Sequence, residues 1–255
     1  GHEVYILTLG TCDAEDEVNH VYRVHSFGLG KLYPDARFSF SKNSPLVNHL
    51  MNWQPDIIHT QGEFSTFLMA QKISKVLNIP MVHTYHTVYE DYTHYFSPNK
   101  LIGKKIVRIL SRKILHPVEE VIAPTQKVKY LLEEYQVKAP VTVIPTGLSL
   151  AQFETPLPEE RKQEMRTQLE IQPGDFVMLS LGRVAKEKNI EELVHFVSEI
   201  DELPLKLIIV GDGPHRPELE ELVAELGIGE KVYFVGMVAP EEVAAYYQVA
   251  DLFVS

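Results

Sequence analysis

The sequence predicts an α/β protein whose parallel β-sheets are covered by α-helices. Short runs rich in β-branched residues alternate along the chain with longer segments whose apolar residues recur at helical spacing. This alternation is typical of parallel sheets, because a crossover between parallel strands needs a segment about as long as a helix. The 255 residues are 45% hydrophobic and 23% charged, an ordinary globular composition that excludes intrinsic disorder.

The predicted elements follow one another from the first residues to the last. The helix at Phe64–Leu77 illustrates the signals, since Asn78 and Pro80 directly after it are residues that end helices. Strands are expected over Val4–Leu9, Asp56–Thr60, Met81–Tyr85, Val121–Pro124, Val141–Ile144, Phe176–Leu181, Leu205–Val210, Val232–Val235 and Leu252–Val254. Helices are expected over Leu46–Asn52, Phe64–Leu77, Leu101–Leu115, Thr125–Tyr135, Pro158–Leu169, Ile190–Ile200, Arg216–Leu226 and Pro240–Gln248.

A segment rich in Pro and Glu divides these elements into two groups. We expect two Rossmann-like domains, residues 1–147 and 173–255, joined by a linker over 148–172. Ligand-binding loops of such domains lie at the carboxyl ends of the strands, so a site is expected in the cleft if those ends face each other. Both chain ends look cut and the second domain is small, so we expect a piece of a longer enzyme.

The charge distribution separates the two halves. The net charge of −11 argues against a general nucleic-acid binder. Residues 1–150 carry 15 basic and 14 acidic side chains, whereas residues 151–255 carry 9 and 21. The single cysteine, Cys12, excludes an intrachain disulfide and is typical of a reducing compartment such as the cytoplasm. No apolar run approaches the length that spans a bilayer, and no signal peptide is visible.

One stretch, residues 98–116, is basic and contains no acid. Apolar residues at helical spacing (Ile102, Ile106, Ile109, Leu110 and Ile114) alternate there with cations. A cationic amphipathic helix on an acidic protein favours docking to an anionic membrane surface. The competing interpretation is a helix packed on the core with a solvated charged face. The predicted membrane-docking residues are Lys100, Lys104, Lys105, Arg108, Arg112 and Lys113.

In the second domain, the strand ending at Gly182 leads into a loop that contains Arg183 and Lys188 and then into a helix. A glycine lets an anion approach the backbone, the helix start offers free N–H groups, and the two cations suit a diphosphate. A solvated surface loop is the alternative. Further donor-binding candidates at later strand ends, which are plain turns on the simpler interpretation, are Gly211, Asp212, Gly236 and Met237.

In the first domain, His86 is the last residue of the run His83-Thr-Tyr-His86 at a strand end and is expected to reach the cleft; the alternative is a packed histidine satisfied by the backbone. Strand alternation places His83 on the opposite face. That opposition disfavours a zinc site of His83, His86 and His94. Side chains expected to contact an acceptor are His59, Gln61, Glu63 and Tyr92. Gln61 and Glu63 are alternatively caps for the following helix, and the aromatic loop of Tyr92 alternatively packs on its own domain.

Taken in order, a series of short motifs resembles the retaining GT-B glycosyltransferases of family 4. The motifs are Gly1–Val4, Pro55–His59, Thr84–Thr87, Ala123–Thr125, Ile144–Gly147, Gly182-Arg183, Lys188-Asn189, Val210–Pro214 and Ala250-Asp251. Within that family, His59–Phe64, the loop Tyr89–Tyr95 and the basic helix resemble bacterial diacylglycerol glucosyltransferases.

The resemblance implies a GT-B fold and roles for particular residues. Arg183 and Lys188 would hold the donor diphosphate of a UDP-sugar and stabilise the leaving UDP, Gly182 would admit the phosphates, and His86 would lie near the donor sugar. No metal or other cofactor is expected. A hexose, glucose by resemblance, would pass to diacylglycerol at the inner membrane face. The alternatives are transfer to a soluble acceptor and a non-catalytic binding module.

Two departures from the family pattern lie at the chain ends. The family's glycine-rich loop after its first strand would precede Gly1, and its acidic Glu-x7-Glu segment would follow Ser255. We therefore expect this chain alone to be inactive.

Overall fold

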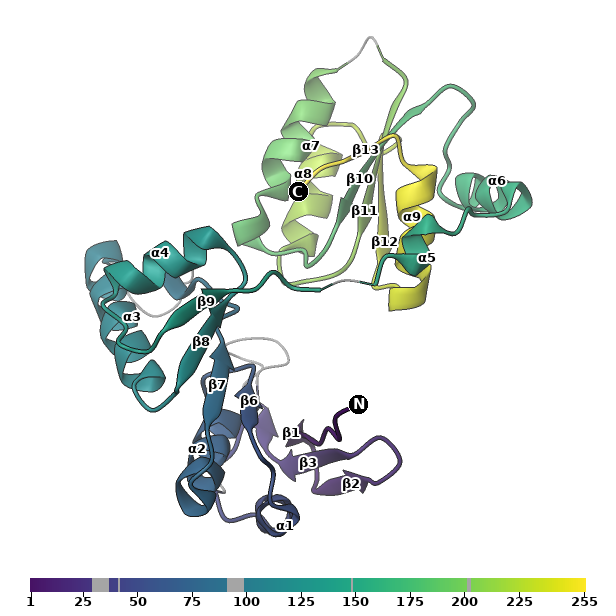
Figure 1. Ribbon diagram of the computed structural model, residues 1–255. Helices are drawn as coiled ribbons and strands as arrows, with labels where there is room; N and C mark the ends of the chain where they lie inside the picture. Colours follow the sequence, from purple (N-terminus) through teal and green to yellow (C-terminus); the bar gives the residue numbers. More distant parts are fainter. Residues whose placement is uncertain (29–36, 41, 91–98, 148, 201–202) are drawn as a thin grey trace. The chain divides into compact units, whose positions relative to one another are not determined.

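The computed structural model describes residues 1–28, 37–40, 42–90, 99–147, 149–200 and 203–255, with the backbone alone at Lys100. The chain forms two compact units, Gly1–Gly147 and Leu148–Ser255, and each is described by itself (Figure 1). Each unit contains a four-stranded parallel sheet with helices between its strands, which confirms the predicted α/β class.

The main sheet of the first unit has its strands in chain order. It contains β6 (Ile58–Thr60), β7 (Met81–Thr84), β8 (Glu120–Ala123) and β9 (Val141–Val143), all parallel. The connecting helices are α2 (Ser65–Leu77), α3 (Lys100–Leu115) and α4 (Gln126–Glu134). Their apolar residues share one core with β7 and β8, in which Met81, Val121 and Leu132 are fully buried. This core fixes where the strands of the sheet end.

The N-terminal part of the first unit contains more strands than the sequence predicted. β1 (Ile6–Gly10) pairs in parallel with β3 (Val21–His25), and β2 (Ala14–Asp16) pairs with β3 in the antiparallel sense. A two-stranded ladder of β4 (Phe27–Gly28) and β5 (Arg37–Phe38) follows. Helix α1 (Pro45–Trp53) begins at Ser44, whose hydroxyl accepts from the Leu46 N–H. Most of the added strands are two or three residues long, too short to give a periodic sequence signal.

The sheet of the second unit reverses its strand order at one strand. Its order is β12 (Val232–Gly236), β11 (Leu205–Val210), β10 (Phe176–Leu181) and β13 (Leu252–Phe253). The chain steps from β10 to one side and later returns to the other side of β10. Such a reversal leaves a crevice at the carboxyl ends of the strands, where α/β proteins bind ligands. In this unit that point is the end of β10.

Strand alternation gives this sheet a core on each face. Leu207 and Ile209 pack with α7 (Ile190–Glu199) and α8 (Arg216–Glu225). Ile208 and Val210 pack on the other face, with the region of α9 (Val243–Val249). Figure 1 shows α7 and α8 on one side of the sheet and α9 on the other. Every residue of β11 is buried, as is typical of an inner strand of a parallel sheet that is covered on both faces.

The segment 148–172, expected to be a linker, belongs to the second unit. It contains α5 (Ala151–Glu154) and α6 (Glu159–Gln168). Met165, Leu169 and Ile171 are buried in the same core as the β10 residues Val177 and Leu179. The Pro- and Glu-rich composition concealed these three apolar residues. The first unit ends at residue 147 as expected, whereas the second begins at 148 rather than at 173.

Helix α3 has apolar residues on two opposite faces. It starts at Asn99, whose side-chain oxygen accepts from the N–H groups of Leu101 and Ile102. Val107 and Leu115 are buried against the core, at 4% and 1% exposure. The residues Leu101, Ile102, Ile106, Ile109 and Leu110, here called the exposed apolar face of α3, are 39–78% exposed. The core-packed interpretation of the sequence is therefore wrong for this face, although Ile114 does pack partly against the core.

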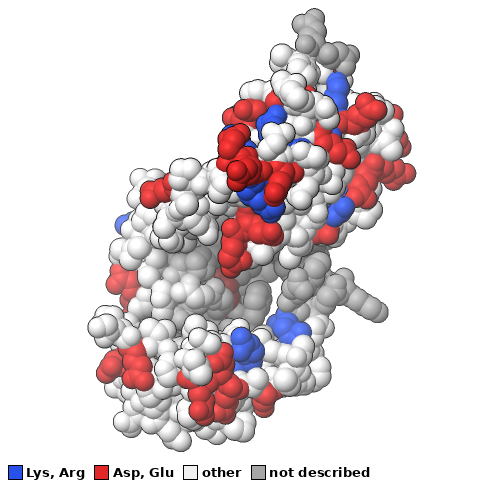
Figure 2. All heavy atoms as spheres, turned by 90° about the vertical axis from the view of Figure 1, so that its right-hand side faces the viewer, with Lys and Arg blue, Asp and Glu red and all other residues white. Residues whose placement is uncertain are grey.

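Acidic side chains gather over the second unit, as Figure 2 shows in the upper part of its view. This distribution agrees with the excess of acids that the sequence carries after residue 150. Within the described part of the chain, the structure contains no helix long and apolar enough to cross a membrane.

Candidate functional site

Three glycines form the carboxyl edge of the second sheet. Gly182, Gly211 and Gly236 lie at the ends of β10, β11 and β12, with φ of 150°, 126° and 87°. The Gly182 N–H donates to the Val210 carbonyl at 2.9 Å, and the Gly211 N–H donates to the Gly236 carbonyl at 2.8 Å. A Cβ on Gly211 would lie 1.9 Å from the Gly182 oxygen. Backbone therefore packs directly on backbone between Gly182 and Gly211.

The two predicted cations lie in the loop that leaves this edge. The loop is tied to the next one, because the Val184 N–H donates to the Asp212 carbonyl at 3.0 Å. Arg183 follows Gly182 and forms an ion pair with Glu187, which leaves its side chain 31% exposed. Lys188 is exposed and ends the 3₁₀ turn Lys186–Lys188. The loop thus presents one oriented cation and one solvent-facing cation at the end of β10, the strand where the order reverses.

Helix α7 begins directly after these cations. Its first residue, Ile190, follows Asn189, whose φ is 51° and whose side chain does not cap the helix. First-turn N–H groups without a side-chain cap carry partial positive charge, as does the helix dipole at this end. Arg183, Lys186 and Lys188 precede this helix start, while acidic residues occupy the turn before it and its first turn.

The remaining donor-binding candidates, Asp212 and Met237, differ in their surroundings. Asp212 is committed to its own turn, because it accepts from the Gly213 N–H at 2.7 Å and lies 3.4 Å from Arg216. Met237, after Gly236, is 81% exposed. The sequence analysis overlooked Arg216, whose guanidinium lies over the Phe234 ring and near Gly236. Its position at the start of an expected helix, just after the Gly-Asp-Gly turn, was the available signal.

In the first unit, a chain of hydrogen bonds joins the predicted polar residues at the ends of β6 and β7. Gln61 Nε2 lies 3.1 Å from His59 Nε2, and Gln61 Oε1 lies 2.6 Å from His86 Nε2. Since an amide nitrogen only donates, His59 Nε2 accepts and His86 Nε2 donates. Thr84, which the sequence analysis missed, adds a contact of 2.7 Å to His59 Nε2. Strand alternation could have found it, because Thr84 and His86 share a face.

The surroundings of His59 keep it neutral. Its pKa is lowered from the ordinary value, chiefly because partial burial disfavours the charged ring, and further by the nearby rings of His83 and His86. A neutral His59 can accept the Gln61 N–H without competition from a second proton. His86, in contrast, is exposed at the end of this chain of hydrogen bonds.

Glu63 is placed differently from the acceptor-binding position expected for it. Its side chain is 7% exposed and lies 3.4 Å from His83 Nε2, and the Tyr89 hydroxyl donates to it at 2.5 Å. Burial and the Glu63 charge together raise the pKa of Tyr89. Neither Gln61 nor Glu63 caps α2, because Phe64 is the N-cap residue and has no side-chain cap hydrogen bond. Glu63 therefore holds Tyr89, the first residue of the loop Tyr89–Tyr95, by a hydrogen bond.

The two histidines of the disfavoured zinc site do lie on opposite faces. His83 is fully buried and contacts the Thr60 hydroxyl at 2.8 Å, whereas His86 is exposed. His94 and Tyr92 lie outside the described residues. Among the residues that are described, no three His, Cys, Asp or Glu side chains are grouped to hold a metal ion.

The cations of α3 divide into two sets. Lys104 pairs with Glu90 at 2.6 Å, Arg108 donates to the Glu134 carbonyl at 2.5 Å, and Arg112 donates to Gln136 at 3.3 Å. These three half-buried cations hold α3 to its own unit. Lys105 and Lys113 are exposed. The predicted docking set is therefore mixed, since half of it has an internal structural partner.

Both halves of the chain match models of glycosyltransferase families. Residues 1–152 match the model described as Glycosyltransferase Family 4, and residues 161–255 match Glycosyl transferases group 1. An α-monoglucosyldiacylglycerol synthase from Streptococcus pneumoniae is 41% identical over the whole chain, which covers 58% of that protein. A protein of the same name from Acholeplasma laidlawii is 31% identical, also over the whole chain, which covers 66% of it. The chain thus spans less than two thirds of these relatives.

A solved structure shares the fold. The crystal structure of Anabaena Alr3699/HepE in complex with UDP-glucose aligns with a TM-score of 0.68 at 20% identity. The alignment covers 93% of this chain and 61% of that one. The GT-B architecture expected from the sequence is therefore confirmed.

The glycine edge yields a test of stability. We expect Gly211→Ala to destabilise the chain by about 3 kcal/mol or more, because the new Cβ meets a backbone oxygen at an unfavourable φ. Gly229→Ala is the control, since a Cβ there meets nothing within 4 Å, and we expect a change within about 0.5 kcal/mol. Urea unfolding followed by circular dichroism measures both; equal midpoints would contradict the packing described.

The histidine chain yields a test by titration. We expect His86→Gln to raise the pKa of His59, because it removes one of the positive charges that oppose protonation, while burial keeps the value below the ordinary one. In the wild type the unfolded chain takes up this proton first, so protonation of His59 opposes folding as the pH falls below about 6.5. NMR titration of the imidazole signals measures the shift. His195→Gln, on α7, should leave His59 unchanged, and an unaltered His59 in His86→Gln would refute the coupling.

Proposed function

The chain belongs to glycosyltransferase family 4, and on that premise we propose that it is the larger part of an enzyme that transfers glucose from UDP-glucose to diacylglycerol. The observation that carries the proposal is the cationic loop at the glycine edge of the second unit. The printed names of the two relatives supply the acceptor and the sugar, since both are synthases of α-monoglucosyldiacylglycerol. The UDP carrier comes from the resemblance of the sequence to the family.

On the donor side, Arg183 and Lys188 neutralise the diphosphate. Charge accumulates on the departing UDP as the glycosidic bond breaks, so cations fixed in advance stabilise the transition state more than the ground state. The ion pair with Glu187 fixes the Arg183 guanidinium in one orientation. The glycines at the ends of β10 and β11 bring no side chain of their own between a phosphate and the sheet edge. With these groups a metal ion is not needed, and we propose that none takes part.

On the acceptor side, the chain of His59, Gln61 and His86 offers hydrogen-bonding groups at the carboxyl ends of β6 and β7. The Gln61 amide donates one hydrogen to His59 Nε2, and its oxygen accepts from His86 Nε2. This second hydrogen bond orients the His86 ring. We propose that His86 contacts the donor sugar next to the reacting centre. His59 and Gln61 would then lie where the acceptor hydroxyl enters.

A lipid acceptor places the reaction at a membrane surface. The exposed apolar face of α3 supports this location, because five large apolar side chains on one helix face are costly to leave in water. Exposed Lys105 and Lys113 on the same helix suit an anionic lipid surface. We propose that the protein is peripheral, on the cytoplasmic face of the cell membrane, with α3 as its contact.

The donor proposal is tested by transfer kinetics of the full-length protein. We expect Arg183→Ala and Lys188→Ala each to lower kcat by about a hundredfold to a thousandfold, because each removes charge stabilisation in the transition state. Lys186→Ala, an exposed lysine of the same turn, is the control and should stay near wild type. Glucose transfer from UDP-glucose to diacylglycerol is the measurement. Wild-type rates in both loop variants would rule out the proposed role.

The membrane proposal is tested by vesicle binding. We expect Ile106→Asp/Ile109→Asp to weaken binding to vesicles of equimolar phosphatidylcholine and phosphatidylglycerol by about a hundredfold, since two side chains no longer enter the lipid. Val18→Asp/Phe196→Asp adds the same charge at other exposed apolar positions and is the control. If both variants bind alike in co-sedimentation, α3 is not the contact and transfer to a soluble acceptor becomes the better proposal.

A further inference from the structure

We propose that His215 is a positioning residue for the donor site, because it joins both ends of the loop that carries Arg183 and Lys188. The His215 N–H donates to the carbonyl of Val184, at the start of the loop, over 3.2 Å. Its ring Nε2 lies 2.7 Å from Oε1 of Glu191, in the first turn of α7 where the loop ends. His215 itself precedes α8, so it ties the cationic loop to the next loop of the sheet edge. This inference rests on the donor role proposed for Arg183 and Lys188.

The surroundings of His215 constrain its ring. The residue is 9% exposed, and the ring lies between two carboxylates, since Oε2 of Glu218 is 3.8 Å from Nδ1. An ionised carboxylate only accepts hydrogen bonds, so Nε2 carries a proton and donates to Glu191. The Glu191 side chain is 45% exposed. A nearly buried donor therefore holds a carboxylate that solvent would otherwise leave mobile.

Acidic residues surround the start of α7, and each is bonded to a partner. The pairs are Glu187 with Arg183, Glu192 with Asn189, and Glu191 with His215. Acids in the first turn stabilise a helix, but the same charges repel a diphosphate that approaches the helix start. The partners of Glu187 and Glu192 belong to the same segment of the chain. The partner of Glu191 comes from a different loop, so only the folded second unit brings the two together.

His215 thus has two effects on the loop. Its backbone contact fixes the point where the loop leaves β10, and its ring contact fixes the point where α7 begins. Arg183 and Lys188 lie between these two points, so their backbone is held in advance of ligand binding. The ring also engages the carboxylate of Glu191, which would be free to turn towards a bound diphosphate if the contact were lost. Loss of the ring is therefore expected to weaken the binding of UDP.

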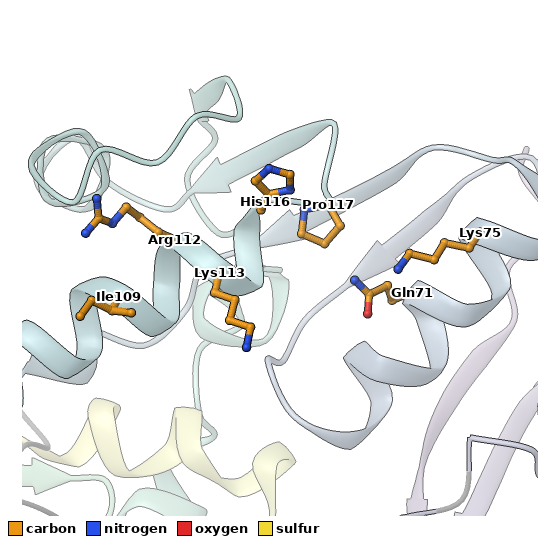
Figure 3. A pocket seen from close by; sticks show the side chains of 7 residues that line it. All are labelled: Gln71, Lys75, Ile109, Arg112, Lys113, His116 and Pro117. Atoms are coloured by element: carbon orange, nitrogen blue, oxygen red, sulfur yellow. The ribbon is translucent and has the colours of Figure 1, made fainter.

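The open groove between α2 and α3 in the first unit lacks such mutual contacts. Gln71 and Lys75 line it from α2, and Lys113 lines it from the end of α3. In Figure 3 the Arg112 side chain points away from Gln71 and Lys75, in keeping with its hydrogen bond to Gln136. The cations of this groove therefore do not meet at one point, whereas the contacts of His215 are continuous.

Binding of UDP to the full-length protein, measured by calorimetry, tests the proposal. We expect His215→Ala to weaken binding about tenfold, since a released carboxylate and a loosened loop both disfavour the diphosphate. His215→Gln keeps an N–H donor near the position of Nε2, so it should recover most of the affinity that His215→Ala loses. Wild-type affinity in His215→Ala would overturn the proposal.

Substitutions at Glu191 separate the effect of charge from that of packing, without disturbing the buried ring. Glu191→Asp keeps the charge on a side chain too short to reach His215, so we expect weaker binding of UDP. Glu191→Gln removes the charge, so we expect binding at least as tight as in the wild type and restored binding when it is combined with His215→Ala. Glu221→Gln, which removes an exposed acid of α8, is the control for net charge.

A purely structural role of His215 predicts no such restoration. A double variant that binds UDP as weakly as His215→Ala would therefore overturn the proposal, as would equal affinities of Glu191→Asp and Glu191→Gln. The thermal midpoint of each variant is recorded, and the affinities are compared at a temperature where all are folded. If His215→Ala does not fold, the two Glu191 variants decide the question.

The result stays separable from the proposed function. If the wild-type protein binds no UDP, the donor role of Arg183 and Lys188 fails, and the role of His215 fails with it. If the wild type binds UDP and His215→Ala binds it equally well, only the role of His215 fails. Transfer of glucose is not needed for either measurement, so a failure on the acceptor side leaves both results intact.

Discussion

The contact of backbone on backbone between Gly182 and Gly211 is the constraint on which the second unit depends. It occurs at the end of β10, where the strand order reverses and an α/β sheet opens a crevice. Because no Cβ fits between the two glycines, the loop that carries Arg183 and the loop after Gly211 stay in backbone contact. The electrostatics of the proposed donor site follow from this packing, in a unit that is otherwise acidic.

The first unit organises its polar groups by hydrogen bonding rather than by close backbone packing. Gln61 links His59 to His86 on the exposed side of β7, while Glu63 holds Tyr89 and faces His83 on the buried side. The ends of β6 and β7 and the residues that follow them thus carry two polar clusters with different surroundings. The exposed cluster can meet a ligand, and the buried cluster positions the loop beside it.

Helix α3 has three faces with different surroundings. One face packs in the core, a flank of Lys104, Arg108 and Arg112 binds its own unit, and the opposite face is apolar and exposed. A helix needed only for folding would have no reason to carry the third face.

The sequence by itself determined the α/β class, the order of the longer elements and the placing of Gly182, Arg183 and His86 at strand ends, because periodicity and strand alternation are local properties. It failed where local signals are weak or ambiguous. The short strands before residue 45 show no recognisable alternation of apolar and polar residues. A Pro- and Glu-rich composition concealed the buried residues Met165, Leu169 and Ile171. Only the tertiary structure decided which face of α3 is buried and that Glu63 points inward, because each of these depends on contacts between residues far apart in the chain.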